Sequence, residues 1–385
     1  MGKWVFLNFE KYLFFLLSVF SFFVFYPAFV TDFGLHNDYV MLDAYSSGFL
    51  KHMESGYMIL IGRALNAVWI NIQNIFIHQI SDFGLWRFIS FCFLMSNTFF
   101  LYRFLIRKFE LEKFWASVIA FGVLFLPANQ VFVLWSGSFV IGTFNVFLVF
   151  GAYFLLDSIG GENILKINFA QSKLVFLKLV GAGVLFVASL FTYPATAMFV
   201  FVLTGTYVLF EPIARWDRTR RIVARDVIFF GMLMVIYRLL DRGVVSPIAL
   251  ASGRFPVLDL ENYQMGISVD VWSKLSLLKE IVVLSISGTG HIVSDYGGLI
   301  FILGTILICL FVLWMKRREI KNCPKYLVVQ IVLFLAGLFF LTNAPMLMAK
   351  GSKVVFGYRV LLPGSALILM VFFSLARLIS GFYKK

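Results

Sequence analysis

The sequence predicts an all-α, polytopic membrane protein with about ten membrane-spanning helices and further interfacial helices on the external side. Two observations predict this fold class. Hydrophobic residues make up 61% of the 385 residues and charged residues only 14%, whereas a soluble domain is roughly a quarter charged. The apolar residues also fall into separate stretches of about 20, the length that a helix needs to cross a bilayer. We expect residues 1–385 to form a single membrane domain.

Ten apolar stretches are suitable spans, and none shows the alternating pattern of a barrel strand. The first is too long for the core of a cleaved signal peptide and has no clear small-x-small cleavage site before Thr31, so it is expected to remain as an anchor. In chain order the predicted spans are 12–30, 84–106, 115–133, 139–156, 174–191, 195–210, 226–240, 297–314, 326–341 and 359–380.

The positive charges indicate how these spans are oriented. The chain carries a net charge of +13, and its most basic segments are two short stretches between spans. Short loops rich in Lys and Arg stay in the cytoplasm, so this pattern places both stretches and both termini there. Membrane orientation thus explains the charge, and no nucleic-acid partner is expected. The two stretches contain Arg215, Arg218, Arg220, Arg221 and Arg225, and Lys316, Arg317, Arg318, Lys321 and Lys325.

One further stretch, 57–78, is apolar enough to span but conflicts with this topology. Counting it as a span would invert every later loop and put both basic stretches outside. Its polar residues fall within about 160° of one another on a helix. We therefore interpret it as an amphipathic juxtamembrane helix lying in the interface. The polar residues are Arg63, Asn66, Asn71, Gln73, Asn74 and His78.

The external side is expected to carry the function, because its loops are the larger ones. They are the first external loop with its juxtamembrane helix, 31–82, a second large region, 241–296, and the loop before the last span, 342–358. All four histidines fall in these regions. The predicted cytoplasmic loops are short and basic and contain no residues that suggest catalysis.

A group of carboxylates follows the first span. Asp38 is the candidate general base, and Asp43 and Glu54 are further candidates in the same loop. A carboxylate there could accept a proton from a hydroxyl at the level of the lipid headgroups. The alternative is that Asp and Asn only cap a helix and mark a solvated loop.

Three short motifs resemble those of a family of membrane enzymes. They are Asn37-Asp38 after the first span, Gly62-Arg63 on the juxtamembrane helix and Tyr193-Pro194 in a later hairpin. With the large first external loop and the many spans, they resemble the polyprenyl-phosphate-dependent glycosyltransferases of the GT-C fold, most closely the phage-type O-antigen glucosyltransferases. That family has two acids where this chain has Asn37 beside a single Asp38, which argues against a role that needs two carboxylates.

The resemblance implies transfer of a sugar from a polyprenyl phosphate, with Asp38 as the base. The departing phosphate needs positive charge where its negative charge develops, and Arg is suited to bidentate phosphate contacts. Direct displacement with one base would invert the anomeric centre. Arg238 and Arg359 could instead extend from span ends to the headgroups. The candidates for binding the phosphate or substrate are Asn37, Arg63, Arg238, Lys350, Lys353 and Arg359, with Tyr193 as a further candidate.

No cofactor is expected. His36 and Asp38 would form half of a metal site, but no second pair of ligands has a recognisable spacing. The sequence therefore predicts no metal site, and a divalent ion stays an alternative.

The leading hypothesis is a glycosyltransferase that moves one sugar, such as glucose or another hexose, to a cell-envelope glycan such as O-antigen. It would act on the periplasmic face of a bacterial inner membrane. Its partners would be the polyprenyl-phosphate-sugar donor, the glycan acceptor, the lipid bilayer and, upstream, a flippase and a cytoplasmic-side polyprenyl-phosphate glycosyltransferase. One alternative is an O-antigen or capsule polymerase, which would use arginines in two large loops. A second alternative is a transporter or flippase of polysaccharide or lipid-linked sugar, which would place ionisable residues at mid-membrane depth.

Overall fold

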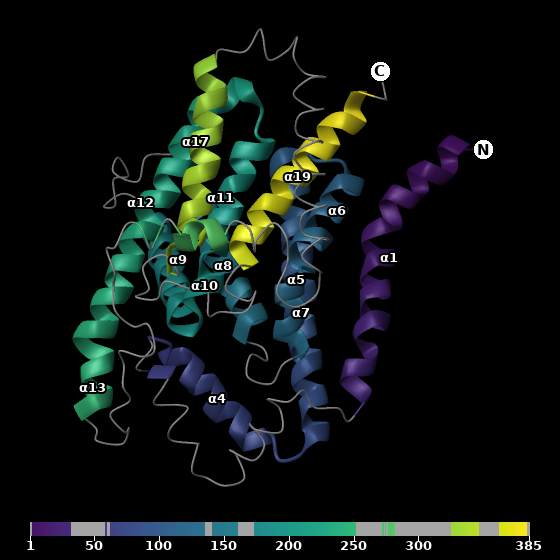
Figure 1. The fold of residues 1–385 in the computed structure, drawn as a ribbon. Helices are drawn as coiled ribbons and strands as arrows, with labels where there is room; N and C mark the ends of the chain where they lie inside the picture. Colours follow the sequence, from purple (N-terminus) through teal and green to yellow (C-terminus); the bar gives the residue numbers. More distant parts are fainter. Residues whose placement is uncertain are drawn as a thin grey trace.

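The computed structural model describes residues 2–31, 58–59, 62–134, 141–160, 173–251, 272, 274, 276–281, 325–345 and 362–382. Every regular element in these ranges is a helix, so the all-α prediction is confirmed for this part of the chain (Figure 1). The elements are α1 (Gly2–Val30), α4 (Ala64–Phe76), η1 (Ile80–Asp82), α5 (Phe83–Phe109), α6 (Lys113–Leu124), α7 (Pro127–Leu134), α8 (Ile141–Asp157), α9 (Lys173–Thr192), α10 (Pro194–Ala197), α11 (Phe199–Phe210), η4 (Ile213–Arg215), α12 (Trp216–Leu240), the π-helix η5 (Asp241–Val245), α13 (Ser246–Ala251), α17 (Lys325–Thr342) and α19 (Leu362–Phe382).

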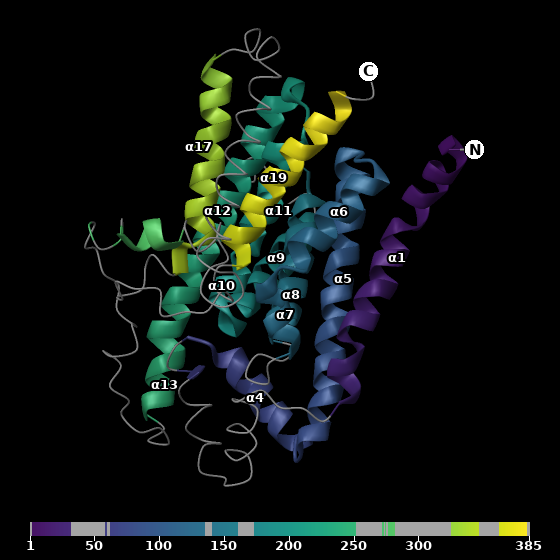
Figure 2. The ribbon, with the colours of Figure 1, turned by 45° about the vertical axis from the view of Figure 1, so that its right-hand side comes forward.

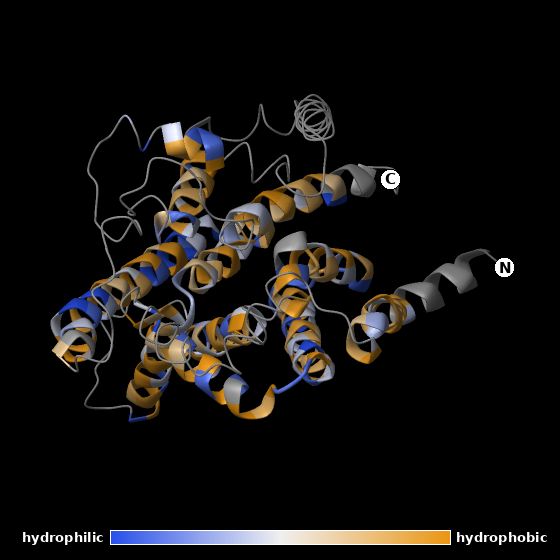
Figure 3. Cartoon of the chain, turned by 60° about the horizontal axis from the view of Figure 1, so that its bottom comes forward, coloured by the Kyte–Doolittle hydropathy of each residue, from blue (hydrophilic) through white to orange (hydrophobic). Residues whose placement is uncertain are grey.

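Three of the described helical stretches are long and apolar enough to cross a membrane: Tyr12–Val30, Ile80–Phe109 and Lys173–Thr192. Large apolar side chains are exposed on them, and Figure 3 shows that hydrophobic residues are abundant along the helices. Several other apolar helices are shorter. The predicted span 297–314 lies outside the described residues. The shorter helices are Lys113–Leu124, Ile141–Asp157, Pro194–Phe210, Val329–Thr342 and Leu362–Arg377.

Helix α11 is the centre of the bundle. All of its residues except Leu209 are buried, because α8, α12, α17 and α19 pack around it. Helix α1 lies at the edge, against α5 and α6 (Figure 2). Helix α1 begins and α19 ends at the same end of the bundle, and α4 lies at the other end (Figure 1).

Two helical regions differ from the predicted spans for physical reasons. The predicted span 115–133 is broken between α6 and α7, where Pro127 begins the second helix. Proline disfavours the helical conformation in the residue before it, so the break falls there. Helix α12 begins at Trp216 rather than at 226, and several arginines of the first basic stretch lie on a helix rather than in a loop. Arginine is a good helix former.

A polar network joins four helices at the end of the bundle where α8 terminates. Asp157 of α8 accepts a hydrogen bond from Tyr207 of α11 and pairs with Lys108 of α5 at 2.8 Å. Close by, Asp226 of α12 accepts a hydrogen bond from the Thr204 hydroxyl of α11 at 2.9 Å and is fully buried. Charged groups placed this deeply need partners, so the network fixes how these four helices meet.

The juxtamembrane helix is present as α4, which lies across one end of the bundle rather than along it (Figures 1 and 2). Its polar residues do not all face away from the bundle. Asn66 and Gln73 are buried against the bundle, whereas Val68 and Phe76 are more than half exposed. The polar side of α4 therefore faces the protein in part.

Candidate functional site

The Gly62-Arg63 motif forms a tight turn ahead of α4. The amide of Gly62 donates to the carbonyl of Ile59 at 3.0 Å, and that of Arg63 donates to the carbonyl of Met58 at 2.8 Å. Gly62 has a φ of +79°, and a Cβ atom there would lie 2.5 Å from the Tyr237 hydroxyl oxygen. Backbone conformation and space both require glycine at this position. The turn can thus lie directly against α12.

Arg63 and Tyr193 meet although they are far apart in the chain. The Cζ atom of the half-buried Arg63 lies 4.4 Å from the centre of the Tyr193 ring, within the range of a cation–π interaction. The tyrosine is buried and its ring also contacts Phe132 edge-on. The stack holds the guanidinium on one side of α4, and a guanidinium is a planar group of N–H donors suited to a planar anion.

The Tyr193-Pro194 motif is the break between α9 and α10. Tyr193 has an extended backbone (φ −156°, ψ 95°), the conformation that the following Pro194 favours. The side chain of Asn145 on α8 donates to the Tyr193 carbonyl at 2.9 Å and to the Thr196 hydroxyl at 2.7 Å. Because Asn145 is fully buried, these bonds hold the break in place.

The end of α12 completes the site. The Tyr237 hydroxyl donates to the Gly62 carbonyl at 2.9 Å. The Asp241 carboxylate lies 3.5 Å from the nearest guanidinium nitrogen of Arg238 and 3.8 Å from that of Arg242. At this point α12 changes to a π-helix, a feature that is frequent at functional sites. We call this group the arginine–tyrosine cluster: Gly62, Arg63, Tyr193, Tyr237, Arg238, Asp241 and Arg242.

The cluster is positively charged. Arg238 and Arg242 lie beside the Asp241 carboxylate, and Arg63 lies near Tyr237, so the described residues of the cluster carry three positive charges and one carboxylate. Burial raises the pKa of Asp241, while Arg242, Arg238 and the Ser246 hydroxyl act in the opposite direction. The side chains of Arg238 and Arg242 are 39% and 41% exposed, so they can reach a ligand. Such a group of guanidinium donors is suited to bind a phosphate or another anion.

The structure brings together three of the residues predicted for the site: Arg63, Tyr193 and Arg238. Their separate motifs meet at one end of the bundle. The other predicted site residues lie outside the described residues, and the structure gives no account of them. They are Asn37, Asp38, Asp43, Glu54, Lys350, Lys353 and Arg359.

Sequence reasoning did not select Tyr237, Asp241 or Arg242 for the site. Asp241 was taken only as the first residue of an external region, and it is in fact almost fully buried. A usable signal was the spacing of Arg238 and Asp241, which places an arginine three residues before a carboxylate at a helix end. Among the described residues, no group of three or more His, Cys, Asp or Glu side chains is placed to hold a metal ion.

Comparison of the chain with protein-family models, with curated proteins and with solved structures found no match. The cluster's own geometry and the resemblance of the three motifs are therefore the basis for a functional proposal.

Proposed function

We propose that this protein is a membrane glycosyltransferase that moves one hexose from a polyprenyl-phosphate donor to a cell-envelope glycan such as O-antigen. The observation that carries the proposal is the meeting of Gly62-Arg63 with Tyr193 and with the end of α12. Two motifs that suggested this class from the sequence are in contact with each other, and positive charge gathers around them. A lipid phosphate that loses its sugar needs charge of this kind.

The reaction exchanges the bond from the anomeric carbon to the phosphate oxygen for a bond to the acceptor oxygen, and one proton moves to the base. Asp38 accepts the proton of the acceptor hydroxyl as its oxygen attacks the anomeric carbon. The bond from that carbon to the phosphate oxygen breaks, and its electron pair leaves with the phosphate. Arg63 and Arg238 stabilise the resulting anion, and one direct displacement inverts the anomeric centre. This chemistry requires no resident metal or cofactor.

The proposal includes ten spans in a bacterial inner membrane, with both termini in the cytoplasm. Support comes from the two ends of the bundle. Arg63, Tyr193 and Asp241, all predicted to be external, gather at one end, whereas Lys108 and Asp157, predicted to be cytoplasmic, are paired at the other. A flippase and a cytoplasmic-side polyprenyl-phosphate glycosyltransferase would supply the donor.

Sugar transfer by the purified protein tests this function. The donor is a hexosyl-phosphoryl-polyprenol, and the acceptor is the envelope glycan of the source cells. We expect Asp38→Asn to reduce the transfer rate by a factor of at least about 100, within the range for loss of a general base. Asp43→Asn in the same loop is the matched control, with a smaller effect. An unchanged rate for Asp38→Asn would overturn the assignment of the base, and no transfer by the wild type would overturn the function.

A further inference from the structure

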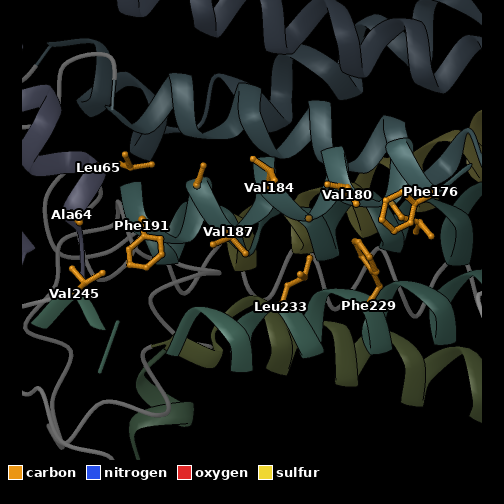
Figure 4. A pocket seen from close by; sticks show the side chains of 13 residues that line it. Ala64, Leu65, Phe176, Val180, Val184, Val187, Phe191, Phe229, Leu233 and Val245 are labelled. Atoms are coloured by element: carbon orange, nitrogen blue, oxygen red, sulfur yellow. The ribbon is translucent and has the colours of Figure 1, made fainter. Parts of the chain in front are cut away.

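An apolar groove runs between α9 and α12 and ends beside Arg63. Its volume is about 670 Å³, and every residue that lines it is apolar. Figure 4 shows side chains of the two helices facing one another along its length, with Val184 opposite Leu233. The groove follows α9 from Phe176 to Phe191, a distance of about 22 Å at the rise of an α-helix.

One end of the groove belongs to the site described above. Ala64 and Leu65 of α4 and Val245 of η5 line that end, directly after Arg63 and close to Arg242 in the chain. Phe191 at this end packs edge-on against the Tyr237 ring, whose hydroxyl binds the Gly62 carbonyl. The apolar groove therefore ends next to the arginine–tyrosine cluster.

The groove is also open along α9, a helix that is long and apolar enough to cross a membrane. Phe176, Val180 and Val184 are between 44% and 62% exposed although they line it. A lipid chain can thus enter sideways from the membrane, and no passage through the protein is needed.

We propose that this groove binds the hydrocarbon chain of an isoprenoid phosphate from the bilayer, with its phosphate at Arg63. The positive charge of the arginine–tyrosine cluster selects a lipid with an anionic headgroup. The position of Arg63 next to one end of the groove sets where the phosphate lies along the groove. A single groove between two helices holds one chain, whereas a phospholipid brings two. The inference rests on the proposed function, which requires a lipid-phosphate donor, and it adds where the lipid lies.

Gly183 provides the variant that tests the groove. An added Cβ atom there would lie 3.6 Å from Leu233, an ordinary contact, so Gly183→Ala fits, whereas Gly183→Leu fills the groove. Gly231→Leu makes the same change on α12, at a position with nothing within 4 Å of the added Cβ atom and outside the groove. It is the matched control.

Native mass spectrometry of the purified full-length protein measures the bound lipid, with undecaprenyl phosphate as the probe and excess phosphatidylglycerol as the competitor. We expect Gly183→Leu and Arg63→Gln each to reduce bound undecaprenyl phosphate at least tenfold, and Gly183→Ala and Gly231→Leu to bind as the wild type does. Equal binding by Gly183→Leu would overturn the proposal. So would displacement of undecaprenyl phosphate by phosphatidylglycerol, because the groove would then hold only bulk lipid.

Photo-crosslinking of the wild type keeps the test independent of how the variants fold. A diazirine on the isoprenoid chain should label peptides that contain Val184 or Leu233. Labelling confined to the lipid-facing side of α1, around Phe15 and Phe20, would contradict the inference. Lipid binding in the groove without sugar transfer would refute the function alone, and transfer without groove labelling would refute the groove alone.

Discussion

Gly62→Ala should disrupt the site through a clash that the structure defines. An alanine at a φ of +79° costs about 1–2 kcal/mol in backbone strain. Its Cβ atom would lie 2.5 Å from the Tyr237 hydroxyl oxygen and 3.3 Å from a carboxylate oxygen of Asp241, which adds about 1–3 kcal/mol of overpacking. We expect a total destabilisation of about 2–5 kcal/mol. The measurement is the apparent unfolding midpoint of the detergent-solubilised protein, followed by size-exclusion chromatography after heating.

Gly160→Ala is the matched control. Gly160 has a φ of +90°, with nothing within 4 Å of an added Cβ atom, so it carries the strain of about 1–2 kcal/mol without the clash. The midpoint should therefore fall less for Gly160→Ala than for Gly62→Ala. In a Tyr237→Phe background, where the clashing oxygen is gone, the cost of Gly62→Ala should shrink towards that of the control. Equal midpoints for the two alanine variants in the wild-type background would refute the reasoning.

Three further predictions test the charges of the structure. Arg63→Lys keeps the positive charge but loses the planar guanidinium donors and the stack on the Tyr193 ring, so the rate of sugar transfer should fall by about tenfold or more. An unchanged rate would exclude a specific role for the guanidinium. Burial raises the pKa of Asp241 above its ordinary value of 3.8, so the protonated carboxyl contributes its full stability below pH 3.8, and this contribution is lost as the pH rises through the raised pKa. The unfolding midpoint should therefore depend less on pH in Asp241→Asn than in the wild type when both are measured between about pH 4 and about pH 8. An equal pH dependence of the midpoint in both proteins would contradict this. Asp157→Asn weakens the bonds from Lys108 and Tyr207 at the far end of the bundle, so it should lower the free energy of unfolding by about 1–3 kcal/mol. The rate of sugar transfer per folded molecule should stay the same, and a selective loss of transfer would contradict a purely structural role.

Composition and charge placement were sufficient to predict the helical class and the general position of most helices. Apolar stretches of spanning length are a strong signal because a bilayer leaves few alternatives. The same signal cannot locate helix ends that lie in water. Helix α12 extends back to Trp216 through arginines that hydropathy counts as loop. The orientation of α4 could not be predicted, because periodicity shows that Asn66 and Gln73 share a face, but not whether protein or water covers it.

The site was predictable where a motif carried unusual residues and unpredictable where it depended on tertiary contact. Gly62-Arg63 and Tyr193-Pro194 contain a glycine and a proline whose backbone demands are visible in the sequence. Asp241 gave no such signal, since a carboxylate after an apolar span normally faces solvent. Its burial follows from the turn at Gly62, which packs on α12 from far away in the chain.

Mass spectrometry of the envelope glycan, from cells with and without the gene, tests the central claim most directly. A transferase of one sugar predicts that deletion removes a single hexose from the glycan and leaves the number of repeat units unchanged, and that Asp38→Asn reproduces the deletion. A glycan of unchanged composition would contradict the proposed function. A change in the number of repeats with every sugar retained would indicate polymerisation in place of single-sugar transfer.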